Sequence, residues 1–418
     1  MKLFRIRFSY LYICFSFFFA AALWYTVKID CLDRAGELKE AGRALLDFWD
    51  VPILLLGTAF FSLLLPKLVD RLSGFSCSRR TAADRTWFLP AFLLMTLWQL
   101  PFLLSFYPAP GMNDTVFMME KGRASLWILA VALLAMLLRS NGLLVALLVS
   151  LALFFLEKRK EILLFLVIFA LISIIPAQVI QRTHHWEPLF QESMAIPLQQ
   201  LGRTMVLGGE RSEETKTLME NLLTEEEWKK EYSPYTVDFV KWHDHFHRNW
   251  LNGQKKEFLS AWVDTGLRNP RIYVEGWLTE TYALWNLDPF EYGVQSRFGW
   301  ALSDENTKDM KPADNDRMAT GNFPLPLWLK ARLANVSYEG SHFIGTGFSL
   351  WITLFLGLVW IRQGKKEYLW AILPLLVNTA TLLLSTPASS VFRYSFAYVL
   401  CLPVLGILTV VGRSESEG

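Results

Sequence analysis

The sequence contains few charged residues and few cysteines for its length. Lys, Arg, Asp and Glu make up 19% of its 418 residues, whereas about 25% is usual in soluble proteins. The 41 basic and 39 acidic residues leave a net charge of +2, and so small a charge argues against a nucleic-acid partner. The cysteines have neither metal-ligand spacing nor a pairing pattern, so we expect no disulfide framework. They are Cys14, Cys31, Cys77 and Cys401.

Motifs of nucleotide-dependent and hydrolytic enzymes are also missing. The chain has no Gly-rich phosphate loop, no Ser–His–Asp arrangement and no zincin motif, so we expect no cofactor. Two short motifs keep a divalent metal open as the alternative. In His243-Asp-His-Phe-His247, alternate histidines would share one face of a strand, although a solvated surface is the favoured interpretation. Asp314-Asn-Asp316 has the D-x-D form that holds a metal in nucleotide-sugar enzymes, but no apolar strand precedes it, which favours a solvated loop.

Long apolar runs dominate what is present. Hydrophobic residues make up 53% of the chain and aromatic residues 15%, and the mean hydropathy is +0.27. This composition is typical of an all-α, polytopic membrane protein. Lys2, Arg5 and Arg7 precede the first apolar run, which predicts an N-terminus in the cytoplasm. That run lacks a small-residue cleavage site, so we expect no cleavable signal.

Hydropathy and basic flanking residues predict about nine membrane spans and three parts of the chain. The spans cover residues 8–27, 51–65, 87–106, 124–138, 143–156, 162–176, 343–361, 368–384 and 395–411. We expect an N-terminal transmembrane bundle over residues 1–178, an external and mostly helical domain over 179–341, and C-terminal transmembrane helices with a short cytoplasmic tail over 342–418. The predicted location is the cytoplasmic membrane, with the large domain outside.

The topology of residues 115–157 has two readings. Basic residues flank this stretch at Lys121, Arg123 and 158–160, and both flanks look cytoplasmic. In the preferred reading, the two apolar runs between them form a hairpin with Arg139 at its outer tip, and one crossing is missing before Lys121. The alternative places Arg139 inside and violates the positive-inside rule at residues 158–160.

Local patterns outside the spans are helical. Apolar residues recur at helical spacing over residues 28–50, which predicts an amphipathic helix on the outer membrane interface. Within the external domain, Thr224-Glu-Glu-Glu227 is a capping box. A helix over 254–267 is expected to end at Gly266 and Asn269-Pro270. Residues 274–285 carry one apolar face of a further helix.

Asp114 is the first candidate catalytic residue. It lies in the polar turn 105–115, where two prolines and a glycine end the preceding apolar run. We expect an acid there to lie at the outer water interface, either as a solvated helix-end residue or as a general base.

Arginines at the expected outer membrane face form the second candidate set. Arg139 separates two apolar runs, Arg203 lies in the external domain, and Arg393 begins the last span. A guanidinium matches phosphate oxygens in a bidentate fork, and a boundary arginine needs a partner or a polar cavity. For any one of them alone, snorkelling to lipid headgroups is an equally good interpretation. Together they favour a site for a lipid phosphate.

Four segments resemble the bacterial domain-of-unknown-function 6020 family. They are Phe106-Tyr-Pro ahead of an external Asp, Leu138-Arg-Ser-Asn-Gly142, the stretch Gln191-Glu-Ser-Met-Ala-Ile-Pro-Leu-Gln-Gln-Leu-Gly-Arg203, and Phe392-Arg-Tyr394. The resemblance covers most of the chain in order. Members of this family are treated as membrane glycosyltransferases of the GT-C type, which use a polyprenyl-phosphate sugar as donor and an acid on the first external loop as base.

The resemblance implies a set of roles. Asp114 would be the base, and the three arginines would stabilise charge on the departing lipid phosphate. The other residues expected to bind substrate, several of them through sugar hydroxyls, are Asn141, Glu192, Gln199, Gln200 and Tyr394. The implied partners are membrane lipid, a polyprenyl-phosphate-linked sugar and a glycan or cell-envelope acceptor.

One departure from the family pattern leaves other functions open. Only residues 116–123 separate the Asp114 turn from the apolar run that leads to the Arg139 motif, whereas the family carries a longer segment there. A shortened, non-catalytic member that binds a glycan or a partner is therefore an alternative. A transporter or flippase of a lipid-linked saccharide is another, although such proteins usually show internal repeats and this sequence shows none.

Overall fold

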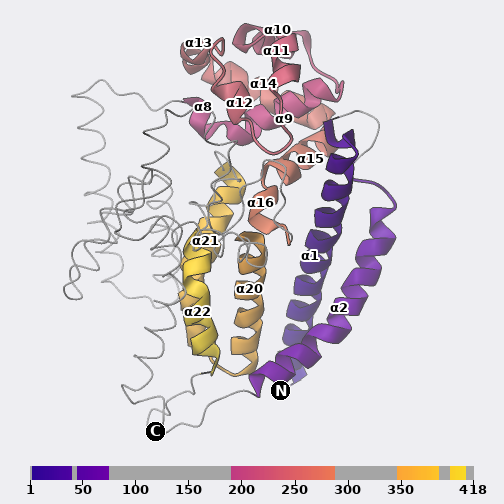
Figure 1. Ribbon diagram of the computed structural model, residues 1–418, viewed down its shortest axis with the longest axis vertical. Helices are drawn as coiled ribbons and strands as arrows, with labels where there is room; N and C mark the ends of the chain where they lie inside the picture. The colour runs from indigo at the N-terminus through magenta and orange to yellow at the C-terminus, as the bar shows by residue number, and fades with distance from the viewer. Residues whose placement is uncertain (1, 40–44, 75–189, 288–345, 386–395, 411–418) are drawn as a thin grey trace, which may run out of the picture.

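The computed structural model describes residues 2–39, 45–74, 190–287, 346–385 and 396–410. Within these ranges the chain is mostly helical and has no strand, only an isolated bridge between Ser233 and Thr236. Figure 1 shows two groups: the apolar helices α1, α2, α20, α21 and α22, which run roughly alongside one another, and a set of shorter helices gathered at one end of them. The predicted all-α class is confirmed for this part of the chain.

Two of the long helices are long and apolar enough to cross a membrane. They are α1 (Lys2–Arg34) and α2 (Asp50–Ser73). On α2, the side chains of Leu55, Leu56 and Leu63 are exposed on its surface, so this helix is not the buried core of a soluble domain. An apolar surface of this kind suits lipid contact.

Three further apolar helices are shorter. They are α20 (Thr346–Arg362), α21 (Leu369–Ser385) and α22 (Phe396–Val410). Seventeen residues of helix are roughly 26 Å long, slightly less than a hydrocarbon core of about 30 Å. The five helices coincide with five of the nine predicted spans. The other four spans lie outside the described residues, so the number of crossings stays a prediction.

Aromatic side chains pack α1, α2 and α20 together. Phe19 of α1 contacts Phe61 of α2 edge to face, with ring centroids 4.9 Å apart, and it also contacts Trp351 of α20. At the other end of these helices, Arg362 Nε lies 2.6 Å from Asp70 Oδ1. The N-terminal span is therefore packed against a helix some 300 residues later in the chain.

The predicted interfacial helix over residues 28–50 is wrong. Its first part is the end of α1, which stops at Arg34; Gly36 then takes a positive φ of 72° and a short 3-10 helix, η1 (Glu37–Lys39), follows. Leu38 and Leu45 are buried against Tyr235 and Tyr282 of the helical domain. The apolar spacing thus reflects packing on protein.

The shorter helices form one helical domain over residues 190–287. They are α8 (Phe190–Ser193), α9 (Ala195–Val206), α10 (Glu213–Leu222), α11 (Glu225–Glu231), α12 (Asp238–Lys241), α13 (Arg248–Gly253), α14 (Lys255–Arg268), α15 (Pro270–Glu280) and α16 (Tyr282–Trp285). Helix α9 lies at the centre, and Leu198, Leu201 and Met205 belong to the core that it shares with α10, α11 and α14. Gly202 lets the rings of Tyr232 and Trp228 approach α9, because a Cβ there would lie 3.1 Å from Tyr232.

Local sequence signals placed several helix ends correctly. Thr224 and Glu227 form both hydrogen bonds of the predicted capping box at α11, and the break between α14 and α15 falls at Asn269 as expected, although Gly266 lies inside α14 and does not end it. The single helix expected over 274–285 is instead divided into α15 and α16 at Thr281.

Helices α15 and α16 connect the helical domain to the apolar helices (Figure 1). The Trp277 indole N–H donates to the Leu383 carbonyl at 2.7 Å, and the Trp351 indole N–H donates to the Trp285 carbonyl at 2.9 Å. Gly347 permits the close approach of α20 to α16, because a Cβ there would clash with the Asn286 backbone. One side of the helical domain is therefore fixed against the ends of α20 and α21.

Candidate functional site

Two carboxylates contact one buried lysine in the helical domain, and the charge of this lysine also acts on a third, buried carboxyl group. We call Glu192, Asp238, Lys241 and Glu280 the carboxylate–lysine cluster. They come from α8, α12 and the last residue of α15. The Lys241 side chain is 1% exposed, and its Nζ lies 2.8 Å from Asp238 Oδ1 and 3.5 Å from Glu192 Oε1. A buried ammonium needs such partners, because leaving water without them costs several kcal/mol, on the order of the Born penalty after relaxation.

Local structure brings these residues together. Asp238 and Lys241 are the first and last residues of α12, one turn apart, which suits an ion pair on one helix face. The Gln191 amide donates to the Lys241 carbonyl at 3.3 Å and so joins α8 to α12. Glu192 follows Gln191 directly, so the hydrogen bond that Gln191 makes to α12 also holds the Glu192 backbone near Lys241.

The two partners of Lys241 differ from Glu280 in their access to solvent. The side chains of Glu192 and Asp238 are 39% and 38% exposed, so each carboxylate has one side on the lysine and one on the surface. Glu280 is fully buried. Burial raises the pKa of the Glu280 carboxyl well above its ordinary value of 4.5, the charge of Asp238 raises it further, and Lys241 opposes the rise. The cluster therefore combines accessible carboxylates with an acid that is held towards its protonated form.

The cluster lies towards the apolar helices. Glu280 follows Trp277 by three residues on α15, which is about one helical turn, and Trp277 is hydrogen-bonded to the end of α21. Helix α9 also contacts α21. Figure 1 shows α8, α9 and α12 on the side of the domain that faces the upper end of α21.

Arg203 lies in a second buried charge group, which we call the Arg203 network. Its Nη2 lies 3.0 Å from Glu275 Oε2, and both side chains are almost fully buried. The other carboxylate oxygen of Glu275 accepts hydrogen bonds from the Leu46 backbone at 3.1 Å and from Arg271 Nε at 3.0 Å. Arg203 Nη1 also donates to the Leu38 carbonyl at 3.5 Å. The network joins α9 and α15 to the connection between α1 and α2.

Neighbouring side chains stabilise the positive charge of Arg203 inside the domain. Burial would lower the pKa of the guanidinium, but Tyr232 and Glu275 outweigh burial and raise it. The guanidinium is thus occupied by Glu275 in this structure. Its predicted contact with a lipid phosphate stays a prediction.

Gln199 and Gln200 are buried and hydrogen-bonded to protein atoms. The Gln199 amide donates to the carbonyls of Ser233 and Pro234, both at 2.8 Å. The Gln200 amide donates to the Tyr273 carbonyl at 2.9 Å, and its carbonyl accepts from the Trp262 indole at 2.8 Å. Both side chains fasten α9 to its neighbours, and their predicted contact with a sugar stays untested.

The remaining predicted site residues lie outside the described residues. They are Asp114, Arg139, Asn141, Arg393 and Tyr394. The described structure therefore shows how Glu192, Gln199, Gln200 and Arg203 are held relative to one another, and the roles of the other five stay predictions.

Three of the four cluster residues, Asp238, Lys241 and Glu280, were not predicted from the sequence. A signal existed for Glu280, which is a lone acid in the run Gly-Trp-Leu-Thr-Glu-Thr-Tyr-Ala-Leu-Trp and so falls on a helix face that the flanking aromatics mark for burial. Asp238 and Lys241 offered only their i,i+3 spacing, which is common on solvated helices.

Comparison with known proteins gives one match. Residues 15–418 match a family described as a family of unknown function, DUF6020. No curated protein matches, and no solved structure matches. The predicted resemblance to this family is thereby confirmed over nearly the whole chain.

Proposed function

We propose that this chain, which belongs to the DUF6020 family of unknown function, transfers a hexose from a polyprenyl-phosphate carrier to a cell-envelope glycan at the outer face of the cytoplasmic membrane. The observation that supports this most is the carboxylate–lysine cluster. It places accessible carboxylates in a helical domain fixed to the ends of apolar helices, where a lipid-linked substrate would present its sugar.

The reaction requires a base and a stabilised leaving group. A hydroxyl oxygen of the acceptor attacks the anomeric carbon, and the bond from that carbon to the phosphate oxygen breaks. The lipid phosphate leaves with the electron pair, and the hydroxyl proton passes to a carboxylate. Positive groups that face the leaving phosphate lower the barrier further. No nucleotide takes part in this step.

Glu192 is the described residue that we place against the substrate. Its carboxylate is partly exposed, and Lys241 fixes it from the inner side at 3.5 Å. Asp114 is the proposed base by the family resemblance, and Glu192 either contacts a sugar hydroxyl or replaces Asp114 as the base. Lys241 acts as a positioning residue, because it is fully buried and reaches the substrate only through its carboxylate partners.

The proposed phosphate ligands are Arg139 and Arg393, with Asn141 and Tyr394 beside them. The same proposal gives Gln199, Gln200 and Arg203 a positioning role, because their polar groups bind protein atoms that hold α9 in place. Helix α9 immediately follows Glu192 along the chain, so its placement fixes the site.

The distribution of basic residues supports an external position for the helical domain. Lys67, Arg71 and Arg362 lie on α2 and α20 near the ends that are remote from that domain (Figure 1). Basic residues mark the cytoplasmic side of membrane proteins. We therefore propose that the helical domain lies outside the cytoplasmic membrane.

The proposal is tested with the full chain in lipid nanodiscs, supplied with polyprenyl-phosphate hexoses and cell-envelope glycans. Release of polyprenyl phosphate together with transfer of the hexose is the expected result. Glu192→Gln should reduce turnover by about 10²–10⁴-fold if the carboxylate is the base. Glu226→Gln, a substitution of an exposed acid on α11, is the matched control and should leave turnover unchanged.

Other outcomes identify the alternatives. Binding of the lipid-linked hexose without turnover by the parent chain would contradict transfer and favour the non-catalytic member. Movement of the intact lipid-linked saccharide across the bilayer, again without transfer, would favour a flippase.

A further inference from the structure

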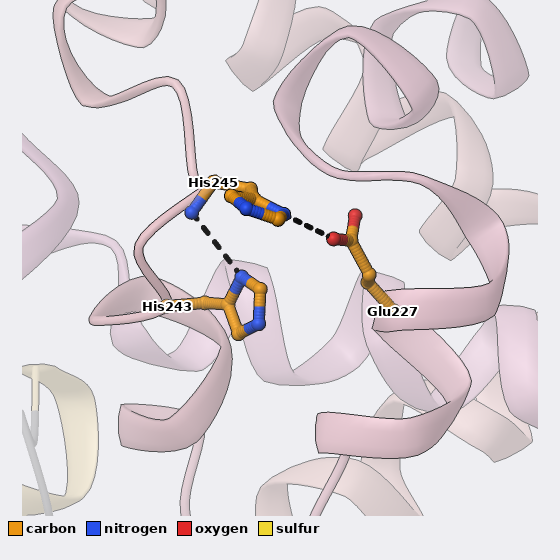
Figure 2. A group of neighbouring side chains, drawn as sticks. All are labelled: Glu227, His243 and His245. Carbon is orange, nitrogen blue, oxygen red and sulfur yellow. Dashed lines mark hydrogen bonds and ion pairs between the residues drawn. The ribbon is translucent and has the colours of Figure 1, made fainter.

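Two histidines and a glutamate converge on the surface of the helical domain, apart from the carboxylate–lysine cluster. Figure 2 shows His243 and His245 on the connection between α12 and α13, and Glu227 opposite them on α11. One potential ligand atom from each residue lies within 4.8 Å of those from the other two. The residues come from segments 16 positions apart, so tertiary packing and not sequence adjacency brings the carboxylate to the imidazoles.

The connection holds the two histidines in a tight turn, not in the strand that their alternation suggested. The Phe246 backbone N–H donates to the His243 carbonyl at 3.0 Å, and the Phe246 side chain is buried in the core of the domain. This anchor leaves His243 and His245 on the outer side. Their rings meet edge to face with centroids 5.1 Å apart.

The third histidine of the motif is directed elsewhere. His247 Nδ1 hydrogen-bonds to the Asn221 carbonyl at 2.7 Å. It therefore belongs to the packing of the connection on α10 and is not part of the converging group. This difference makes His247 a matched control for the other two.

Glu227 is fixed before any ligand arrives. Its Oε2 accepts hydrogen bonds from the backbone and the hydroxyl of Thr224 in the capping box, at 3.2 and 2.6 Å. Its Oε1 lies 2.5 Å from His245 Nδ1 (Figure 2). The Thr224 hydroxyl and, next, the His245 contact lower the pKa of Glu227 to about 2, so the carboxylate is ionised at neutral pH.

We propose that Glu227, His243 and His245 form a Zn²⁺ site that ties α11 to the connection between α12 and α13. Two imidazoles and one carboxylate are ligands that zinc prefers, and three protein ligands leave the fourth tetrahedral position for water. Calcium and magnesium prefer sites built from oxygen ligands, which this one is not.

A modest side-chain movement completes the geometry. Zinc bonds of 2.0–2.1 Å place tetrahedral ligand atoms roughly 3.3 Å apart. Glu227 Oε1 and His245 Nδ1 must therefore separate slightly from 2.5 Å, and a ligand atom of His243, which lies within 4.8 Å of one from each of the other two residues, must take the same spacing. His245 is exposed, and His243 is half-buried with its Nδ1 accepting from the His245 backbone N–H at 3.3 Å (Figure 2), so rotation of the His243 ring gives up only this long hydrogen bond. His243 follows Lys241 by two residues, so zinc would also fix the end of the helix that carries the cluster lysine.

The test uses the full chain in detergent, purified with a tag that contains no histidine. Equilibrium dialysis against ZnCl₂ followed by metal analysis should give one tightly bound Zn²⁺ per chain. His243→Ala and His245→Ala should each weaken binding by at least tenfold, because losing even an outer partner of a ligand typically costs about 10–100-fold. Glu227→Gln should also weaken binding, and it separates the ligand role from folding because Gln still completes a capping box.

Two controls define the site. His247→Ala should retain wild-type affinity, and so should the double variant His184→Ala/His185→Ala, which removes another histidine pair of the chain. Zinc should raise the melting temperature of the wild-type chain and of both controls but not that of His245→Ala.

The proposal is overturned if the His243 and His245 variants bind Zn²⁺ as tightly as the parent chain. It is also overturned if the parent binds no zinc, or if the His184/His185 variant alone loses it. None of these outcomes depends on glycosyl transfer.

Discussion

The Arg203 network and the carboxylate–lysine cluster are both groups of buried charges in the helical domain. They differ in how fully their negative charges are compensated by positive ones. In the Arg203 network, the Glu275 carboxylate receives Arg203, Arg271 and a backbone N–H, so its charge is fully compensated. In the cluster, three carboxyl groups share Lys241 as their common cation.

This difference suits the Arg203 network to stabilising the fold and the carboxylate–lysine cluster to catalysis. The charges of Arg203 and Glu275 already compensate each other, so neither needs a substrate as a partner. Because breaking a buried pair is costly, this pair is suited to holding α9, α15 and the α1–α2 connection together. An acid-rich group that combines accessible carboxylates with a buried acid of raised pKa, Glu280, is suited to general acid–base chemistry. The predictions below test this division, first by stability and last by activity.

The largest stability loss is expected at the Arg203 network. Arg203→Ala should destabilise the chain by about 3–5 kcal/mol, because it leaves the buried Glu275 carboxylate without its main partner. Chemical unfolding of the detergent-solubilised chain, followed by tryptophan fluorescence, measures the change. The double variant Arg203→Ala/Glu275→Ala should lose less than the sum of the two single variants. If the stability losses of the two single variants simply add in the double variant, the pair is not coupled, and the contrast between the Arg203 network and the carboxylate–lysine cluster is wrong.

A smaller loss is expected at Gln200. Gln200→Met keeps the volume but leaves the Trp262 indole N–H and the Tyr273 carbonyl without their partner. An unsatisfied buried polar group costs about 1–3 kcal/mol, so stability should fall by an amount in that range. The same unfolding assay checks it. A stability equal to wild type would mean that Gln200 does not fasten α9 to α14 and α15.

The pH dependence of stability should identify Glu280. Its pKa is raised in the folded state, so its contribution to stability is fully present below its unfolded pKa of about 4.5. The contribution is lost as pH rises from that value through the folded pKa. Glu280→Gln cannot ionise, so melting temperatures of this variant should lack the decline that the parent shows as pH rises above about 4.5. Parallel pH profiles for the variant and the parent would show that Glu280 does not titrate in this range.

The smallest effect is expected at an exposed ion pair, which sets the baseline for the comparison. Lys229 Nζ lies 2.6 Å from Glu225 Oε1 on the surface of α11. An i,i+4 pair of this kind contributes about 0.3–0.5 kcal/mol, so Lys229→Ala should change stability by no more than about that amount, and the difference should shrink in 1 M salt. A loss as large as that of Arg203→Ala would mean that burial does not decide the strength of these pairs.

The sequence predicted local features better than it predicted which distant residues meet in the folded chain. The capping box at Thr224 and the helix break at Asn269 depend on neighbouring residues only, and both were placed correctly. Glu192 was identified through the family resemblance. Its meeting with Lys241 and Glu280 could not be predicted, because it depends on how α8, α12 and α15 pack.

The misread stretch over residues 28–50 shows the same limit. Its apolar spacing indicated a buried face, but not whether lipid or protein covers that face. Leu38 and Leu45 are in fact covered by Tyr235 and Tyr282, which are about 200 residues later in the chain. Periodicity reports that a face is apolar, and only tertiary structure reports its partner.

The central claim is that Glu192 serves chemistry while the Arg203 network serves folding. The most direct test is to measure hexose transfer and unfolding on the same preparation of Glu192→Gln, with Glu226→Gln as the control. The account predicts that Glu192→Gln loses transfer by about 10²–10⁴-fold if its carboxylate is the base, while its loss of stability stays well below that of Arg203→Ala, because Lys241 keeps Asp238 as a partner at 2.8 Å. Full transfer activity in Glu192→Gln, or a loss of transfer matched by unfolding of the chain, would contradict it.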